Sequence, residues 1–286
     1  MKYPIPFDER ELKLKAIQMR KDIVLETFSA GSGHPGGSLS AVEMFIVLYN
    51  CILKHDSENS RWEDRDKFVL SKAHITPAYY SILSRTGYID PKELVTFRKL
   101  GSFLQGHPKQ DIDHGIEIGG GSLGQNFSIA GGIALGMKLK NKQTRVFVMS
   151  SEGELQEGSM WETAMSIPHF KLNNLCLLVD YNRLQIDGKT EEVMEVEPLD
   201  KKFSAFNWNV ININGHEVKE VYDALKKFEE FSLSTPRPTA IIAKTIKGKG
   251  VAYMADVCGW HGKAPNKEEY DKAIQELEAQ EKTLTQ

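Results

Sequence analysis

Two polar segments of this sequence carry groups that could together hold a divalent metal ion. Glu152 lies just after an apolar run at residues 146–149, and Asn182 lies just after a second run at residues 175–179. If these runs are neighbouring parallel strands, a carboxylate, an amide oxygen and the backbone carbonyl of Leu184 converge at one sheet edge. Such hard oxygen ligands suit Mg²⁺ or Ca²⁺, and Mg²⁺ keeps positions open for phosphate oxygens. The alternative is that the acidic stretch beginning at Glu152 is a solvated turn before a helix.

Several histidines stand in loops where glycine or proline lets the backbone approach a ligand closely. These are His34, His74, His107 and His261. An imidazole titrates near neutral pH, which suits proton transfer. The alternative for the glycine-rich segment at residues 31–37 is a turn between two helices whose histidine is solvated. The histidines outside such settings, which we expect to be structural or exposed, are His114, His169 and His216.

Alternating helices and strands must position these groups. Apolar residues at helical spacing predict helices over residues 8–29, 41–53, 125–138, 161–170, 217–230 and 267–281. Short apolar runs predict buried strands at residues 68–70, 146–149, 175–179, 208–213 and 239–243. This alternation favours an α/β fold with a mostly parallel sheet and helices on both faces. Gly31 should end the first helix and Ser40 should cap the second, and the helix in the tail at residues 266–286 should be charged and mostly solvated.

Composition sets limits on the class of protein. The 286 residues are 41% hydrophobic and 26% charged, as in an ordinary globular protein, and we expect one domain over residues 1–286. A net charge of −3 gives no overall attraction to nucleic acid or to a membrane surface. No run approaches the roughly 20 apolar residues of a membrane span. The three cysteines form no Cys-x-x-Cys pair, so we expect no zinc site and no disulfides. No signal segment is recognisable, so we expect a cytoplasmic protein.

Several of these segments resemble the transketolase family. The stretches GELQEGSMWETAM and LVDYNRLQIDG are similar to its thiamine diphosphate motif, and Asn182 follows Glu152 at the family's spacing of about 30 residues. The GHPG loop around His34 and three further histidine loops, the last reading WHG, occur in the family's order. Residues 119–125 resemble the glycine-rich loop that packs on the cofactor. The resemblance extends from about residue 14 to about residue 265.

The resemblance implies a thiamine diphosphate-binding fold and the transfer of a two-carbon ketol unit from a ketose phosphate to an aldose. It assigns a metal, Mg²⁺ with Ca²⁺ or Mn²⁺ as substitutes, to Glu152, Asn182 and the Leu184 carbonyl. It assigns cofactor binding to Gly121, Leu123, Gly153, Glu154, Asn182 and His261. It assigns three roles to His34, His74, His107 and His261: contact with the oxygens of the donor sugar, proton transfer, and contact with the diphosphate. Glu157 matches a glutamate of an acidic network at the subunit interface, and its alternative is an acid in the first turn of a helix.

Five positions depart from the family pattern, the first being Ser151, which stands where a glycine is usual. Glu152 stands where an aspartate is usual, and its extra methylene must shift the metal or the loop, which Mg²⁺ tolerates less well than Ca²⁺. Ala73 replaces a glycine, Gly120 a threonine and Asn126 a glycine. The last two should add flexibility on one side of the glycine-rich loop and bulk on the other, and so affect the substrate more than the fold.

The resemblance also implies a partner. In this family a glutamate on a separate pyrimidine-binding domain activates the cofactor, and full-length members are more than twice as long. We therefore expect two copies of this chain to assemble with two copies of a C-terminal, pyrimidine-binding transketolase subunit. The alternatives are a split transketolase for an unusual modified sugar, and a non-catalytic scaffold with a degenerate metal site. Deoxyxylulose phosphate synthases and ketoacid dehydrogenase α chains share the fold, but the QEGSMWE and LQIDG segments point away from both.

Overall fold

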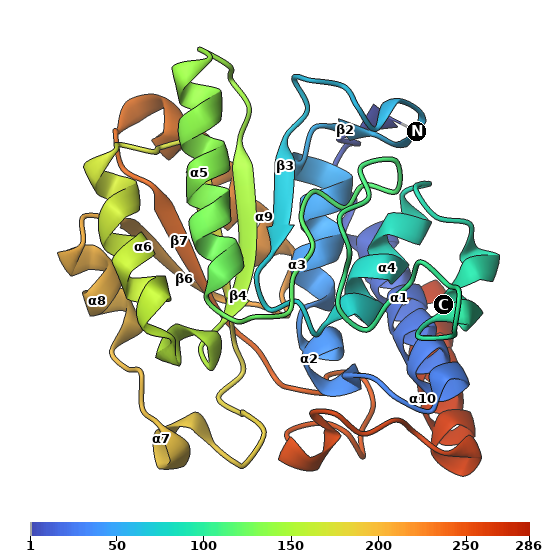
Figure 1. Ribbon diagram of the computed structural model, residues 1–286. Helices are drawn as coiled ribbons and strands as arrows, with labels where there is room; N and C mark the ends of the chain where they lie inside the picture. Colours follow the sequence, from blue (N-terminus) through green and yellow to red (C-terminus); the bar gives the residue numbers. More distant parts are fainter. Residues whose placement is uncertain (1) are drawn as a thin grey trace.

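A five-stranded parallel sheet runs through the centre of the protein, of which the computed structural model describes residues 2–286 (Figure 1). Its strands, in spatial order, are β3 (Lys67–Leu70), β4 (Val146–Ser151), β5 (Leu175–Tyr181), β7 (Thr239–Lys244) and β6 (Asn209–Asn214). The five predicted strands are confirmed, with small shifts at their ends. Phe147 and Met149 enter the core on one face, and Val146 and Val148 enter the core on the other. Because both faces are buried, β3, β4, β5 and β7 read as apolar runs, whereas the edge strand β6 is only partly buried.

Helices cover both faces of the sheet, so the expected α/β class is confirmed. On one face lie α1 (Glu9–Ala30), α3 (Val42–Val47), α4 (Thr76–Arg85) and α9 (Val218–Ser234). On the other lie α5 (Gln125–Leu139), α6 (Gly158–His169) and α8 (Leu199–Ala205). Shorter elements are the antiparallel pair β1 (Lys2–Tyr3) and β2 (His55–Asp56), helices α2 (Pro35–Ser40) and α7 (Thr190–Val193), and a π-helical turn (Leu48–Ile52) that extends α3. Within residues 2–286, no helix has both the length and the apolar character needed to cross a bilayer.

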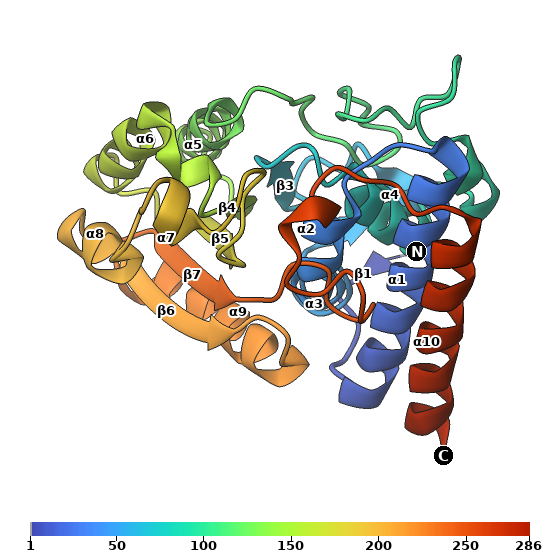
Figure 2. The ribbon, with the colours of Figure 1, turned by 90° about the horizontal axis from the view of Figure 1, so that it is seen from below.

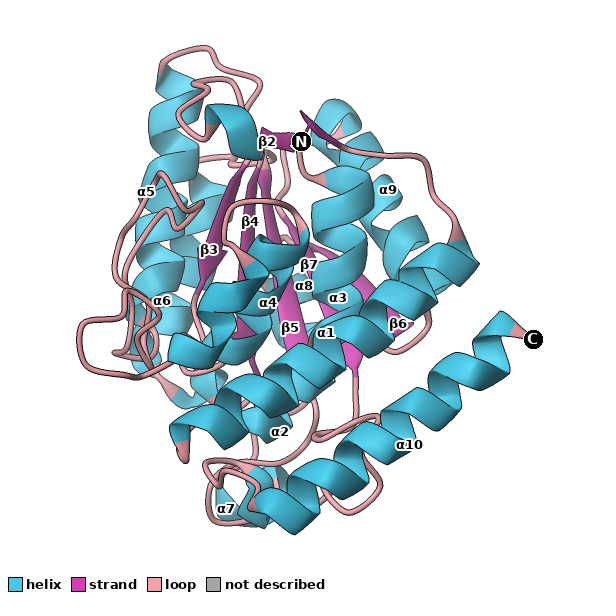
Figure 3. Cartoon of the chain, turned by 90° about the vertical axis from the view of Figure 1, so that its right-hand side faces the viewer, coloured by secondary structure: helices cyan, strands magenta, loops and turns pink. Residues whose placement is uncertain are grey.

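The last helix, α10 (Lys267–Thr285), lies along α1 and not on the sheet (Figures 2 and 3). Ala273 and Leu277 are its only described residues buried in the core, and Lys21 of α1 donates to Glu281 at 2.6 Å. The charged helix that the sequence predicts is therefore present, and a narrow apolar seam holds it in place.

The segment between α1 and α3 differs from its prediction. α1 does end where expected, because Gly31 adopts a left-handed conformation with φ of 60°. The chain becomes helical again at Pro35, so the predicted loop is short and Gly36 and Gly37 lie in a helix. A proline suits the first helical position because its fixed φ is helical and its missing N–H has no partner there anyway. Ser40 is therefore the last residue of α2 and does not cap the next helix.

The carboxyl ends of the strands lie at the bottom of Figure 1, and Figure 2 shows this edge from below. Strands β4 and β5 are neighbours, with Ser151 paired to Asp180 at their ends. The loops that leave β3, β4, β5 and β7 therefore gather here, close to α2. Open α/β sheets bind their ligands at such edges.

Candidate cofactor-binding site

A cleft of about 350 Å³ opens among these loops. Most residues predicted for a site line it: His34, His74, His107, His261, Gly121, Leu123, Gly153, Glu154, Glu157, Asn182 and Leu184. Glu152 does not line it. This fully buried side chain lies beneath the residues that line the cleft. There it accepts a hydrogen bond from the backbone N–H of Asn182 at 3.2 Å. The fold thus brings into one place groups that come from seven separate parts of the chain.

Three imidazole rings form a triangle in the cleft. The ring centroids of His34, His74 and His261 are 5.1, 5.2 and 5.3 Å apart. Burial, helped by nearby cationic groups, lowers the pKa of His34 to about 4 and the pKa of His261 to about 3. It also lowers the pKa of His74 well below its usual value. The three rings are therefore neutral near pH 7, and each can both donate and accept a hydrogen bond.

Two buried lysines face the same cleft. Lys72 forms an ion pair with the carboxylate of Asp180. Lys247 lies with its Nζ 3.1 Å from the carbonyl oxygen of Leu184 and 2.9 Å from Nδ1 of His261, and both of these groups are neutral. Burial, reinforced by the charge of Lys72, lowers the pKa of Lys247 to about 8. Burying a cation without an opposite charge is costly, so an anionic ligand in the cleft would stabilise this lysine.

The acidic loop after β4 is buried at Glu152 and Glu154, which a fully solvated turn does not explain, although Glu157 at its end is exposed. Glu152 and Glu154 are fully inaccessible, and Oε1 of Glu152 has no hydrogen-bond partner within residues 2–286. Burial, reinforced by the Asp180 carboxylate, raises the pKa of Glu152 to about 8. A carboxylate oxygen without a partner within residues 2–286, close to the backbone amide of Asn182, fits a divalent cation. Such a cation would satisfy this oxygen and favour its charged form.

Glu154 connects three loops in the wall of the cleft. Its Oε1 accepts hydrogen bonds from the hydroxyl of Ser71 at 2.7 Å and from the backbone N–H of Gly124 at 3.0 Å. Burial raises its pKa to about 7. The contact holds the glycine-rich loop, with Gly121 and Leu123, against the ends of β3 and β4.

Three of the departures from the family pattern touch one another. A Cβ atom on Gly120 would lie 2.5 Å from Nδ2 of Asn126 and 2.8 Å from the Cβ of Ala73. The Asn126 amide donates to the carbonyl oxygens of Leu70 at 2.9 Å and Gly119 at 3.1 Å. The family's threonine therefore cannot fit at position 120 beside Asn126 and Ala73. These departures are one coupled change that ties the glycine-rich loop to the end of β3, and not the gain of flexibility expected from the sequence.

A close backbone approach joins α2 to the C-terminal histidine segment. A Cβ atom on Gly36 would lie 2.7 Å from the carbonyl oxygen of Trp260, which is too close for any side chain. The backbone N–H of Gly248 also donates to the carbonyl of Gly36 at 2.9 Å. Glycine at position 36 thus lets the segments that carry His34 and His261 meet.

Asp180 is a site residue that the sequence analysis missed, as are the two lysines. Its carboxylate accepts hydrogen bonds from Ser40 at 2.6 Å, from Asn182 at 3.1 Å, and from Lys72 and Thr245. Burial alone would raise the pKa of Asp180, but Lys72 and the hydroxyl donors hold it below its usual value. The available signal was position, because Asp180 is the sixth residue of β5 and both lysines follow strands of the same sheet.

The remaining predicted residues lie at or outside the rim. Glu157 is exposed and immediately precedes α6, where its side chain makes no capping hydrogen bond. His114 pairs with Asp111 at 2.7 Å, and His169 is exposed. His216 is buried outside the cleft. None of these three histidines lines the cleft.

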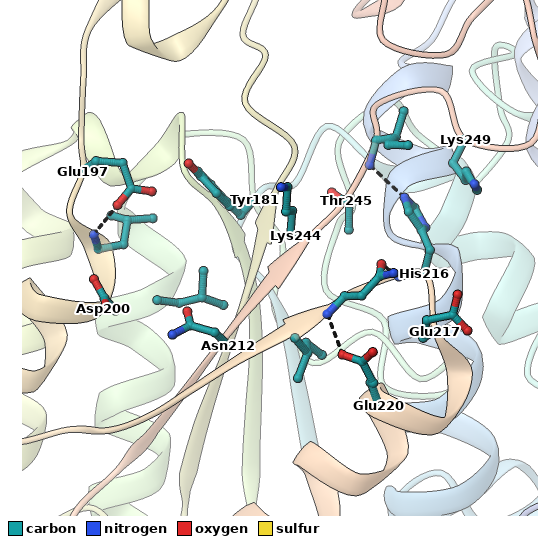
Figure 4. Close-up of a pocket in the computed structure, with 15 residues that line it drawn as sticks. Tyr181, Glu197, Asp200, Asn212, His216, Glu217, Glu220, Lys244, Thr245 and Lys249 are labelled. Atoms are coloured by element: carbon teal, nitrogen blue, oxygen red, sulfur yellow. Dashed lines mark hydrogen bonds between the residues drawn. The ribbon is translucent and has the colours of Figure 1, made fainter.

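A second and larger groove, of about 650 Å³, lies beside β6 and β7 (Figure 4). It contains Tyr181, His216 and Lys244, but none of the residues predicted for a site. Three of its four carboxylates, those of Glu197, Asp200 and Glu220, already accept hydrogen bonds from backbone N–H groups. We therefore place the functional site in the smaller cleft with its buried charges.

Comparison with known proteins identifies the family. Residues 13–284 match the family described as "Transketolase, thiamine diphosphate binding domain". The chain thus belongs to the transketolase family and has its thiamine diphosphate-binding fold. It is 36% identical over 266 residues to one of the subunits of an apulose-4-phosphate transketolase from Phocaeicola vulgatus, covering 93% of both chains. It is 37% identical over 268 residues to a 6-deoxy-6-sulfo-D-fructose transketolase subunit from Clostridium sp., covering 94% of this chain and 96% of the other.

Among solved structures, the fold is similar to that of transketolase from Campylobacter jejuni. The TM-score is 0.83 at 28% sequence identity, over 96% of this chain. The chain spans only 45% of the length of that transketolase, whereas it spans nearly all of the two subunits named above.

Proposed function

We propose that this chain is the diphosphate-binding subunit of a two-chain transketolase, and that the cofactor lies in the cleft with the imidazole triangle. The observation that carries this proposal is Lys247, a buried cation that faces the cleft and forms no ion pair within residues 2–286, although the more distant carboxylates of Glu152 and Asp180 partly oppose the lowering of its pKa. A diphosphate would supply a directly paired negative charge. Together with Lys72 it provides two ammonium groups for the phosphate oxygens.

The metal that accompanies the diphosphate would be held by Glu152, Asn182 and the carbonyl oxygen of Leu184, with Mg²⁺ as the expected ion. The unpaired Oε1 of Glu152 supports this set. The Leu184 carbonyl now accepts a hydrogen bond from Lys247, so the lysine must release it when a metal binds. Further contacts to the cofactor are proposed for Gly121, Leu123, Gly153, Glu154 and His261.

When bound, thiamine diphosphate would supply the carbanion chemistry that transfer of a two-carbon unit needs. The residues of this chain bind and orient the substrate beside it. His34, His74 and His261 are neutral, so they can donate hydrogen bonds to sugar oxygens and accept hydrogen bonds from sugar hydroxyls. His107 adjoins the glycine-rich loop, since a Cβ on Gly121 would lie 3.5 Å from its ring, and we propose that it binds the sugar at the entrance.

A pyrimidine-binding partner subunit completes the enzyme in this proposal, as two copies of each chain in the cytoplasm. The packed helices α5 and α6 support a partner surface because they expose large apolar side chains. These are Ile129, Leu139 and Met165. Glu157 lies beside this surface, where it can join contacts between subunits.

The donor in this proposal is a ketose phosphate. A second candidate is a modified sugar, because the two subunits that match over nearly their whole length are named for apulose 4-phosphate and for a sulfonated fructose. The coupled change at Gly120 and Asn126 lies next to the cleft and supports an altered substrate. A scaffold without a metal is the third candidate, and the unpaired oxygen of Glu152 weighs against it.

A ketol-transfer assay tests the proposal. The chain is assayed alone and mixed with a pyrimidine-domain subunit, with thiamine diphosphate, Mg²⁺ and either a ketose phosphate or a modified ketose. We expect transfer only in the mixture. Full transfer by the chain alone would contradict the two-chain assembly, and no transfer from any ketose, even with a partner that binds, would favour the scaffold.

A further inference from the structure

The loop that carries Lys247 is held from outside the cleft at two points. The backbone N–H of Ile246 donates to Nε2 of His216 at 2.7 Å, and the carbonyl of Lys249 accepts from Nε of Arg20 at 3.0 Å. These bonds flank Lys247 on either side. Figure 4 shows His216 beside Lys249, with a dashed line from its ring to the backbone nitrogen of Ile246.

The two holding groups are joined by a buried carboxylate. Glu43 accepts a hydrogen bond from Nδ1 of His216 at 3.0 Å through one oxygen and from the guanidinium of Arg20 through the other. The side chains of all three are less than a tenth exposed. Because Nε2 of His216 accepts from a backbone N–H, its proton must sit on Nδ1, and Glu43 fixes the ring in this tautomer.

The arrangement joins three parts of the chain that lie far apart in the sequence. Arg20 lies on α1, Glu43 lies on α3 just after the helix that follows His34, and His216 lies between β6 and α9. Gly250 closes the loop against Arg20, since a Cβ there would lie 2.5 Å from the arginine Cδ. The position of Lys247 therefore depends on three residues that do not line the cleft.

We infer that His216, held by Glu43 and Arg20, is a positioning residue for cofactor binding: it fixes the Ile246 backbone so that Lys247 points into the cleft. This inference rests on the proposed role of Lys247 with the diphosphate. It gives a binding role to a residue outside the site, read from the sequence as structural or exposed. Groups that orient a ligand-binding side chain typically contribute about tenfold or more to affinity when they are removed.

A double-mutant cycle tests this inference. Thiamine diphosphate affinity is measured with Mg²⁺, up to millimolar cofactor, for the unaltered chain, His216→Ala, Lys247→Met and the double variant. We expect His216→Ala to weaken binding about tenfold in the unaltered background and to have little effect in the Lys247→Met background. Equal weakening in both backgrounds would overturn the positioning role. If Lys247→Met leaves the affinity unchanged, the proposed role of the lysine fails, and this inference fails with it.

Amide hydrogen exchange provides a second readout that needs no ligand. Residues 245–250 should exchange faster in His216→Ala and keep their protection in Lys247→Met. His114→Ala, which removes another carboxylate-paired imidazole, is the matched control and should change neither readout. If His216→Ala does not fold, His216→Gln replaces it, because a glutamine oxygen can still accept from Ile246. If the hydrogen bond accepted from Ile246 is what positions the loop, His216→Gln should bind cofactor within about threefold of the unaltered chain. Tenfold weaker binding, with the amides of residues 245–250 still protected from exchange, would contradict the inference.

Discussion

Nζ of Lys247 lies 2.9 Å from Nδ1 of His261, and both side chains face the same cleft. The ammonium donates to the imidazole, so this histidine stays neutral and the lysine keeps its charge directed at the cleft. The pair joins the end of β7 to the C-terminal histidine segment, and these parts of the chain meet only in the folded protein.

Replacing Lys247 should change stability and affinity in opposite directions. Lys247→Met removes a buried charge whose pKa is lowered to about 8, so the cofactor-free chain should gain roughly 1–3 kcal/mol at pH 7. Thiamine diphosphate should bind roughly 10–100-fold more weakly, because charge-assisted contacts to phosphate are lost. Thermal unfolding and calorimetric titration measure the two effects.

Lys244→Met is the matched control, because Lys244 is exposed at the end of β7 and lines the other groove. It should leave both quantities unchanged. A Lys247→Met chain that is less stable and binds normally would show that the lysine is structural.

The coupled change at the glycine-rich loop predicts a rescue. Gly120→Thr should destabilise the chain by about 1–3 kcal/mol, because its new side chain overlaps Asn126 and Ala73. Adding Asn126→Gly and Ala73→Gly should recover much of this loss, a coupling of about 0.5–3 kcal/mol. Chemical unfolding of the single and combined variants measures the coupling. Strictly additive effects would mean that the contacts at Gly120 are not tight in solution.

Acid should destabilise the fold partly through His55. Burial lowers the pKa of this histidine to about 4, while an unfolded histidine titrates near 6.5. The unfolded chain therefore binds more protons between these values, and stability is lost as pH falls from about 6.5 to about 4. In His55→Gln, the loss of unfolding free energy from pH 7 to pH 5 should be smaller by roughly 1–2 kcal/mol. His169→Gln, at an exposed position on α6, should not alter this difference.

The partner surface can be tested without touching the cleft. Met165→Glu places a charge on the exposed apolar side of α6, so association with a pyrimidine-domain subunit should weaken at least tenfold while the thermal midpoint stays within a few degrees. Leu233→Glu is the control, because Leu233 is also apolar and exposed but lies on α9. Sedimentation or size-exclusion of the mixed subunits measures the effect. Equal behaviour of the two variants would move the partner surface elsewhere.

Apolar patterning was enough to predict β3, β4, β5 and β7, because strands buried on both faces are apolar along most of their length, whereas the edge strand β6 is only partly buried. Gly31 was equally informative, since its left-handed conformation ends α1. The start of α2 at Pro35 was missed because its glycines read as a loop, whereas Gly36 is needed for close packing on Trp260.

The site was predictable only where local motifs carry it. The histidine loops and the acidic loop after β4 have recognisable spacing, and the fold brings them into one cleft. The burial of Lys247 and the contact of Gly120 with Asn126 depend on tertiary packing between distant segments. No local pattern records such contacts, so only the structure could supply them.

The central claim is that the cleft binds thiamine diphosphate together with a metal held by Glu152. The most direct measurement is a calorimetric titration of thiamine diphosphate with and without Mg²⁺, using the unaltered chain, Glu152→Gln and Glu152→Asp, each mixed with a pyrimidine-domain subunit. We predict Mg²⁺-dependent binding by the unaltered chain, its loss in Glu152→Gln, and stronger Mg²⁺-dependent binding in Glu152→Asp, because the shorter carboxylate restores the family geometry. The claim would be contradicted if the affinity for thiamine diphosphate did not depend on Mg²⁺, or if it were the same in all three chains.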